Sequence, residues 1–139
     1  MKTIKMGFMV PKREGYGEDS SPLYIEKENF YAVGVFDGMG GSGAATCKSD
    51  YGDNHTKAYV ASRIIQEAMS NYIEKAERIT VINPDELKKT VKERLEQEKS
   101  KYPTKSSGLR SKLVRDYPTT LAITTASQNE DGRYSINSY

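Results

Sequence analysis

Residues 30–43, FYAVGVFDGMGGSG, are the stretch on which the interpretation of the whole chain depends. The apolar run from Tyr31 to Phe36 predicts a buried strand. It ends on a carboxylate, Asp37, which closely spaced glycines follow. Glycine accepts positive φ and lets a ligand approach the main chain closely. The stretch therefore predicts a metal or phosphate site at the end of a strand, although the same residues also suit a plain strand-to-loop turn.

Two kinds of ligand fit this stretch. Residues 38–43 match G-x-G-x-x-G, the dinucleotide fingerprint, which requires a helix that begins at once. The residues that follow are rich in Asp, Asn and Gly and predict a loop over 44–56 instead, and Asp37 would repel a pyrophosphate. The Asp37 carboxylate and the Gly38 carbonyl supply oxygen ligands, which Mg²⁺ and Mn²⁺ prefer. The pattern favours a hard divalent cation over a nucleotide.

A second acidic pair is expected to meet Asp37. Residues 23–26 and 30–36 predict two strands joined by a polar turn. Glu18 and Asp19 precede the first strand, whereas Asp37 follows the second. Because antiparallel pairing brings those two ends together, the sequence predicts that the three carboxylates lie close to one another.

The motif VFDGMGG at residues 35–41 resembles a signature of the metal-dependent protein phosphatases, the protein phosphatase 2C or PPM family, in its bacterial form. Three further segments are similar to motifs of that family, in the same order. They are GEDS at 17–20, AYVASRIIQEA at 58–68, and PTTL at 118–121, where Pro118 stands in place of a glycine. The resemblance extends over essentially the whole chain.

The resemblance implies an α+β fold, part of a four-layer α-β-β-α sandwich with antiparallel sheets. It implies hydrolysis of phosphoserine or phosphothreonine in a phosphoprotein substrate, at a two-metal centre of Mn²⁺ or Mg²⁺. Glu18, Asp19, Asp37 and the Gly38 carbonyl would belong to that centre. Arg13 would bind the substrate phosphate, because a guanidinium can donate two parallel hydrogen bonds to it; Arg13 also suits a solvated loop.

Residues 1–139 are expected to form the N-terminal portion of a single phosphatase domain. In the family, a strand at the position where this sequence closes leads to further segments that donate two more aspartates. On this expectation the chain alone is weakly active or inactive, and it self-associates or pairs with a separate C-terminal half. The alternative is a non-catalytic partner-binding module or a degenerate phosphatase scaffold.

The composition excludes several other classes of protein. A chain of 139 residues with 36% hydrophobic and 29% charged residues suggests one polar domain. No apolar run approaches the roughly 18 residues of a membrane span, and a net charge of +2 gives no attraction for nucleic acid or membranes. The single cysteine, Cys47, cannot form an intramolecular disulfide. Without a recognisable signal peptide, a cytoplasmic location is expected.

The remaining elements follow from periodicity and capping signals. Alternation predicts a strand over 3–10 and strands over 119–127 and 133–139, joined by a turn at 129–132. Helical spacing predicts an amphipathic helix over 57–77, and Asn83-Pro84 opens a second helix that runs to about Lys101. The basic connector 102–117 fits a solvated loop better than a nucleic-acid patch. His55, the only histidine, could donate a proton but also suits the surface.

Overall fold

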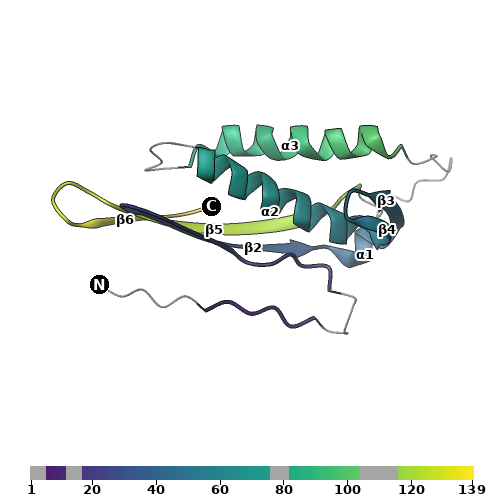
Figure 1. Ribbon diagram of the computed structural model, residues 1–139, viewed down its shortest axis with the longest axis horizontal. Coiled ribbons are helices and arrows are strands. Elements are labelled where there is room, and N and C mark those ends of the chain that lie inside the picture. Colours follow the sequence, from purple (N-terminus) through teal and green to yellow (C-terminus); the bar gives the residue numbers. More distant parts are fainter. Residues whose placement is uncertain (1–5, 12–16, 76–81, 104–115) are drawn as a thin grey trace.

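The computed structural model describes residues 6–11, 17–75, 82–103 and 116–139. The chain is an α+β protein whose main sheet is antiparallel throughout, as predicted. The strand order is β1-β2-β5-β6, and the helices cover one face of this sheet (Figure 1). The strands are β1 (Leu23–Lys27), β2 (Phe30–Gly38), β5 (Thr119–Gln128) and β6 (Tyr134–Ser138).

Both predicted hairpins of the main sheet are confirmed. A two-residue turn at Glu28 and Asn29 joins β1 to β2, and a turn that contains Gly132 joins β5 to β6. Gly132 has φ +81°, which a residue with a Cβ rarely adopts. Since β2 pairs with β5, the two hairpins lie side by side and form one continuous sheet.

The β2 strand is apolar on both faces, but the helices cover only one of them. Phe30, Ala32 and Phe36 are buried beneath the helices, whereas Val33 and Val35 are 41% and 58% exposed on the opposite face. A strand covered on both faces reads as one continuous apolar run, which is how β2 reads in the sequence. Residues 6–11 run along the far side of the sheet from the helices (Figure 1).

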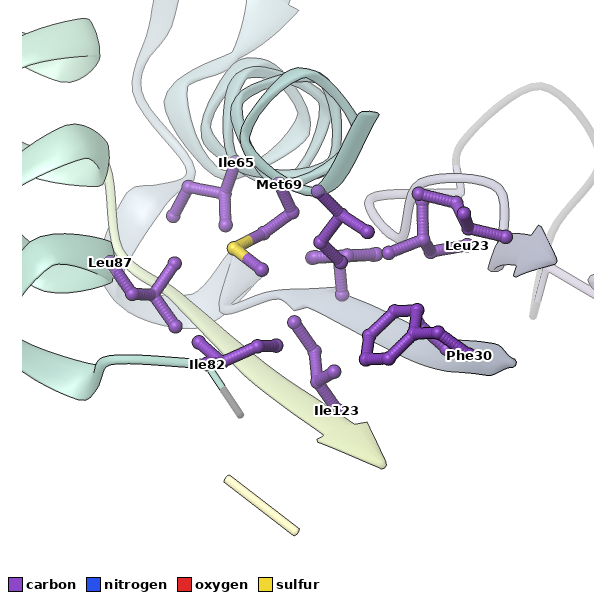
Figure 2. Close-up of a cluster of buried hydrophobic side chains, with 11 residues drawn as sticks. Leu23, Phe30, Ile65, Met69, Ile82, Leu87 and Ile123 are labelled. Atoms are coloured by element: carbon purple, nitrogen blue, oxygen red, sulfur yellow. The ribbon is translucent and has the colours of Figure 1, made fainter. Parts of the chain in front are cut away.

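Two long helices form the covering layer. The α2 helix (Lys57–Lys75) packs on the sheet and the α3 helix (Pro84–Lys101) packs on α2, so both predicted helices are confirmed (Figure 1). The main core lies between α2 and the sheet (Figure 2). Its labelled members are Leu23, Phe30, Ile65, Met69, Ile82, Leu87 and Ile123. In the described part of the chain, no helix combines the length and the apolar character needed to cross a bilayer.

The α3 helix begins as predicted, with Asn83 as its capping residue, and the contribution of this cap to stability can be measured. The Asn83 side chain accepts hydrogen bonds from the backbone N–H groups of Asp85 (3.0 Å) and Glu86 (3.4 Å), and Pro84 occupies the first helical position. Replacing Asn83 by Ala should lower the free energy of unfolding by about 1 kcal/mol, and Asn83→Ser should largely preserve it. Urea denaturation measures both. Equal stability of all three proteins would mean that the cap contributes nothing.

The strand predicted over 3–10 is wrong for residues 6–10. These residues have no regular secondary structure, and the side chains of Met6, Phe8 and Val10 are about four-fifths exposed. Within the described ranges no strand pairs with them, and alternation alone does not supply partners for backbone N–H and C=O groups. Residues 3–5 lie outside the described residues, as do 104–115 of the predicted connector.

The loop predicted over 44–56 is also wrong, because most of it forms a hairpin. The strands β3 (Thr46–Ser49) and β4 (Gly52–Thr56) pair with each other, and a one-turn helix, α1 (Gly40–Gly43), precedes them. Cys47 is buried in a second apolar cluster with Val60 and Ile64 of α2. Packing of this side chain on α2 outweighs the turn-forming polar residues around it, a tertiary effect that local propensity does not capture.

Candidate acidic site at the end of β2

The structure brings the two acidic motifs together at the end of β2. The backbone N–H of Ser20 donates to the carbonyl of Phe36 (3.1 Å), which ties the segment before β1 to the last residues of β2. Asp19 and Asp37 are therefore neighbours, and the negative charge of Asp19 acts on the Asp37 carboxyl group. A neighbouring negative charge disfavours the ionised form of a carboxyl group.

The pKa of Asp37 reflects this crowding. Partial loss of solvent raises its pKa above the ordinary value, and three further causes act in the same direction: the negative charge of Asp19, a hydrogen bond that protonated Asp37 donates to Asp19, and the charge of Glu18. All of these causes disfavour the ionised form. The end of β2 is thus a concentration of negative charge that a bound cation would relieve.

Glu18 is held by the first turns of α2. The hydroxyl of Thr56 donates to Glu18 Oε1 (2.7 Å) and accepts from the backbone N–H of Tyr59 (3.1 Å), so Thr56 also caps the helix. The hydroxyl of Ser62 donates to the Glu18 backbone carbonyl (2.5 Å). A carboxylate is favoured near a helix N-terminus by the helix dipole. Both the side chain and the main chain of Glu18 are consequently fixed by α2.

Close approach of neighbouring groups, not positive φ, explains Gly38 and Gly40 of the DGMGG motif. A Cβ on Gly38 would lie 2.5 Å from the Glu18 carbonyl oxygen and 2.7 Å from that of Ala58. A Cβ on Gly40 would coincide with the carboxylate of Glu18. Neither glycine has a positive φ. Gly38 and Gly40 therefore let the backbone after β2 approach Glu18 and the start of α2 more closely than a residue with a Cβ could.

The PTTL segment completes the site from β5. Thr120 pairs with Asp37 in the sheet, and the hydroxyl of Thr119 donates to the Asp37 backbone carbonyl (2.7 Å). The backbone N–H of Met39 donates to the carbonyl of Pro118 (3.1 Å). The turn that follows Asp37 is therefore anchored on both sides. All four sequence motifs lie together in space.

The short α1 helix lies within the G-x-G-x-x-G stretch, so the dinucleotide interpretation has to be compared with the structure. A helix does begin within G-x-G-x-x-G, contrary to the prediction, but it is four residues long and no side chain caps it. Glu18 and Asp37 lie beside its start. Their negative charge opposes the binding of a pyrophosphate there, so the geometry still disfavours a dinucleotide.

The donors at the site are oxygens, as a hard divalent cation requires. Among the described residues, no three His, Cys, Asp or Glu side chains are arranged in metal-binding geometry. Glu18 accounts for this in part, because its carboxylate is directed to Thr56 and Gly40. Asp19 and Asp37 border an open hollow of about 190 Å³. The donor chemistry fits Mn²⁺ or Mg²⁺, although the side chains do not form a complete coordination sphere.

The remaining candidate residues do not add a side-chain ligand or a nucleophile to the described part of the site. Arg13 lies outside the described residues. Gly38 is buried at the last position of β2. Cys47 is buried, and loss of solvent raises the pKa of its thiol, which does not suit a nucleophile. The ring of His55 stacks on that of Tyr59, with centroids 4.0 Å apart.

Sequence reasoning missed the residues that hold the acids in place. Thr56 and Ser62 fix Glu18, Thr119 fixes the main chain at Asp37, and Arg63 lies beside the Glu18 carbonyl. A threonine directly before a helix is a capping signal, so Thr56 could have been recognised as a helix cap. Ser62, Arg63 and Thr119 stand in segments that resemble family motifs. Nothing in those motifs predicts that their side chains contact the Glu18–Asp19 segment or the main chain at Asp37.

Comparison of the chain with protein-family models, with curated proteins and with solved structures finds no match.

Proposed function

We propose that this chain supplies the acidic part of a divalent-cation centre that hydrolyses phosphoserine or phosphothreonine in proteins. One observation carries the proposal: Glu18, Asp19 and Asp37, which belong to two separate motifs of the phosphatase signature, converge at one end of the sheet. A scaffold alone has no need for converging carboxylates, because their mutual repulsion costs stability.

Each residue has a defined part in this proposal. Asp19 and Asp37 would hold Mn²⁺ or Mg²⁺ together with the Gly38 carbonyl, and Glu18 would support them from its fixed position at α2. Such ions lower the pKa of a bound water and stabilise charge on a transferring phosphoryl group. Arg13 would bind the phosphate of the substrate by paired hydrogen bonds. The open hollow beside Asp19 and Asp37 leaves room for a substrate to approach them.

The proposal includes the four-layer sandwich. Its support is the face of the main sheet that no helix covers, where Tyr24, Val33 and Val35 are 41–58% exposed. The side chain of Asp37 lies on the same face, because Asp37 is two residues after Val35 in β2 and side chains two apart in a strand share a face. A second sheet on this face would bury the apolar side chains and place the acids at the rim of the sandwich. A cytoplasmic location belongs to the same proposal.

Titration of the purified chain with Mn²⁺ by calorimetry tests the proposal. We expect saturable binding that Asp37→Asn abolishes and Glu130→Gln retains, because Glu130 is an exposed acid in the β5–β6 turn. Asp37→Asn removes one of several repelling charges, so its stability without metal should equal or exceed that of the wild type. Lost binding in a stable variant then reports on the site and not on unfolding.

Phosphate release from a phosphoserine peptide completes the test. Mn²⁺-dependent release that is lost in Asp37→Asn would support hydrolysis directly. Binding without phosphate release would support the cation centre and contradict hydrolysis by the purified chain. If neither Mn²⁺ nor Mg²⁺ binds, the proposal fails, and the non-catalytic partner-binding or scaffold alternative replaces it. Binding of a dinucleotide without a cation would favour the nucleotide interpretation.

A further inference from the structure

We propose that Arg63 is a positioning residue for the acidic site. Through its contacts with Tyr59 and Ser62, Arg63 holds the Glu18–Asp19 segment against Asp37. The consequence for cation binding rests on the proposed function. The positioning itself does not, and it can be measured without a cation.

Arg63 is held flat by a stack of side chains along the start of α2. Its Cζ lies 3.3 Å from the centroid of the Tyr59 ring. The His55 ring also stacks on Tyr59, with an interplanar angle of 7°. A guanidinium gains both cation–π attraction and planar stacking on such a ring. The stack limits the directions in which the guanidinium can donate.

The guanidinium is directed at the backbone of the acidic segment. Arg63 Nη1 donates to the carbonyl of Tyr59 (3.0 Å) and to the hydroxyl of Ser62 (3.3 Å), and it reaches the carbonyl of Glu18 (3.5 Å). The Ser62 hydroxyl donates to the same Glu18 carbonyl (2.5 Å). Arg63 therefore orients Ser62 and supports the Glu18 carbonyl at the same time. All three contacts come from Nη1, so they depend on where the stacked guanidinium places this one nitrogen, and a lysine ammonium has no planar group to stack in the same way.

The positive charge of Arg63 allows two roles to be told apart. A counter-charge and a positioning residue predict opposite changes in cation affinity when Arg63 is replaced. The negative charge of Asp19 acts on Arg63 across the site. If Arg63 were only a counter-charge for the carboxylates, its removal would strengthen the attraction for a cation. If it positions them, its removal disorders the ligands and weakens binding, as loss of groups that orient metal ligands usually does.

The first experiment measures the dissociation constant of Mn²⁺ for Arg63→Lys, Arg63→Gln and Tyr59→Leu. We expect each to rise about 10- to 100-fold. Lys75→Gln removes a cation from the last turn of the same helix and should leave the constant unchanged. Tighter binding by Arg63→Gln together with unchanged binding by Arg63→Lys would overturn the proposal, because charge alone would then explain both.

The second experiment needs no cation. Hydrogen exchange of the Ser20 amide, which donates to Phe36, should accelerate about fivefold in Arg63→Lys and Arg63→Gln, the scale of one lost hydrogen bond. Amides of Ile64 and Ile65 in α2 should keep their protection, which shows that the fold is intact. Unchanged exchange at Ser20 would overturn the positioning role. Faster exchange in a protein whose wild type binds no Mn²⁺ would support positioning and refute the proposed function alone.

Discussion

Gly38→Ala is expected to lower the free energy of unfolding by about 3 kcal/mol, at the upper end of the usual range for overpacking. The added Cβ would lie 2.5 Å from the Glu18 carbonyl oxygen and 2.7 Å from that of Ala58. Both are backbone atoms, so no side-chain rotation relieves the contact. The acidic segment or the start of α2 must move away from β2, which also breaks the arrangement of the carboxylates.

Gly41→Ala is the matched control, three residues further along the same motif. A Cβ on Gly41 meets nothing within 4 Å, and alanine restricts the unfolded chain more than glycine does. Its stability should therefore equal the wild type or exceed it by about 0.5 kcal/mol. Chemical denaturation of the three proteins measures the difference. A Gly38→Ala protein as stable as Gly41→Ala would contradict the close approach of the backbone at this site.

Glu98→Ala is expected to lower the free energy of unfolding by about 2 kcal/mol, the scale of one lost hydrogen bond together with a small cavity. Glu98 lies on α3 and is fully buried. Its Oε1 accepts from the backbone N–H of Asp50 at the β3–β4 turn (3.0 Å), and its Oε2 lies 3.9 Å from Arg94. Removal leaves the Asp50 N–H without this acceptor and opens a cavity between α3 and the hairpin.

The same helix offers a control for Glu98. Glu96 is 58% exposed and pairs with Lys99 at the surface, so Glu96→Ala should change the stability by no more than about 0.5 kcal/mol. Glu98→Gln keeps an acceptor for Asp50 and removes the buried charge, so it should recover most of the loss. Thermal unfolding compares the variants. Equal effects of the two alanine substitutions would show that the buried carboxylate does not hold the hairpin to α3.

The main sheet and the long helices could be predicted because their signals are local. The strand β2 is indicated by its own apolar run, and the start of α3 is indicated by Asn83, so both can be recognised from a few neighbouring residues. The β3–β4 hairpin could not be predicted in this way, because it depends on the packing of Cys47 against α2. The strand predicted over 3–10 failed at 6–10 for the opposite reason: the alternation is present, but the described residues supply no paired strand.

The same distinction applies to the acidic site. The meeting of Asp19 and Asp37 follows from the geometry of a hairpin, so it could be expected from the order of the motifs. The contacts of Thr56 and Arg63 could not, because they depend on how α2 is placed over the end of β2. Helix placement is decided by packing across the whole core, not by residues near the motif.

The hydrogen bond from Thr119 to the Asp37 carbonyl has a consequence for the order of folding. The two residues are 82 positions apart, and closing so long a loop carries an entropic cost before any contact compensates it. Pairings of this separation make folding slow. During synthesis the acidic site cannot be completed until the ribosome has released β5. Ligands of the finished site would therefore be recognised only by a chain whose main sheet has already assembled.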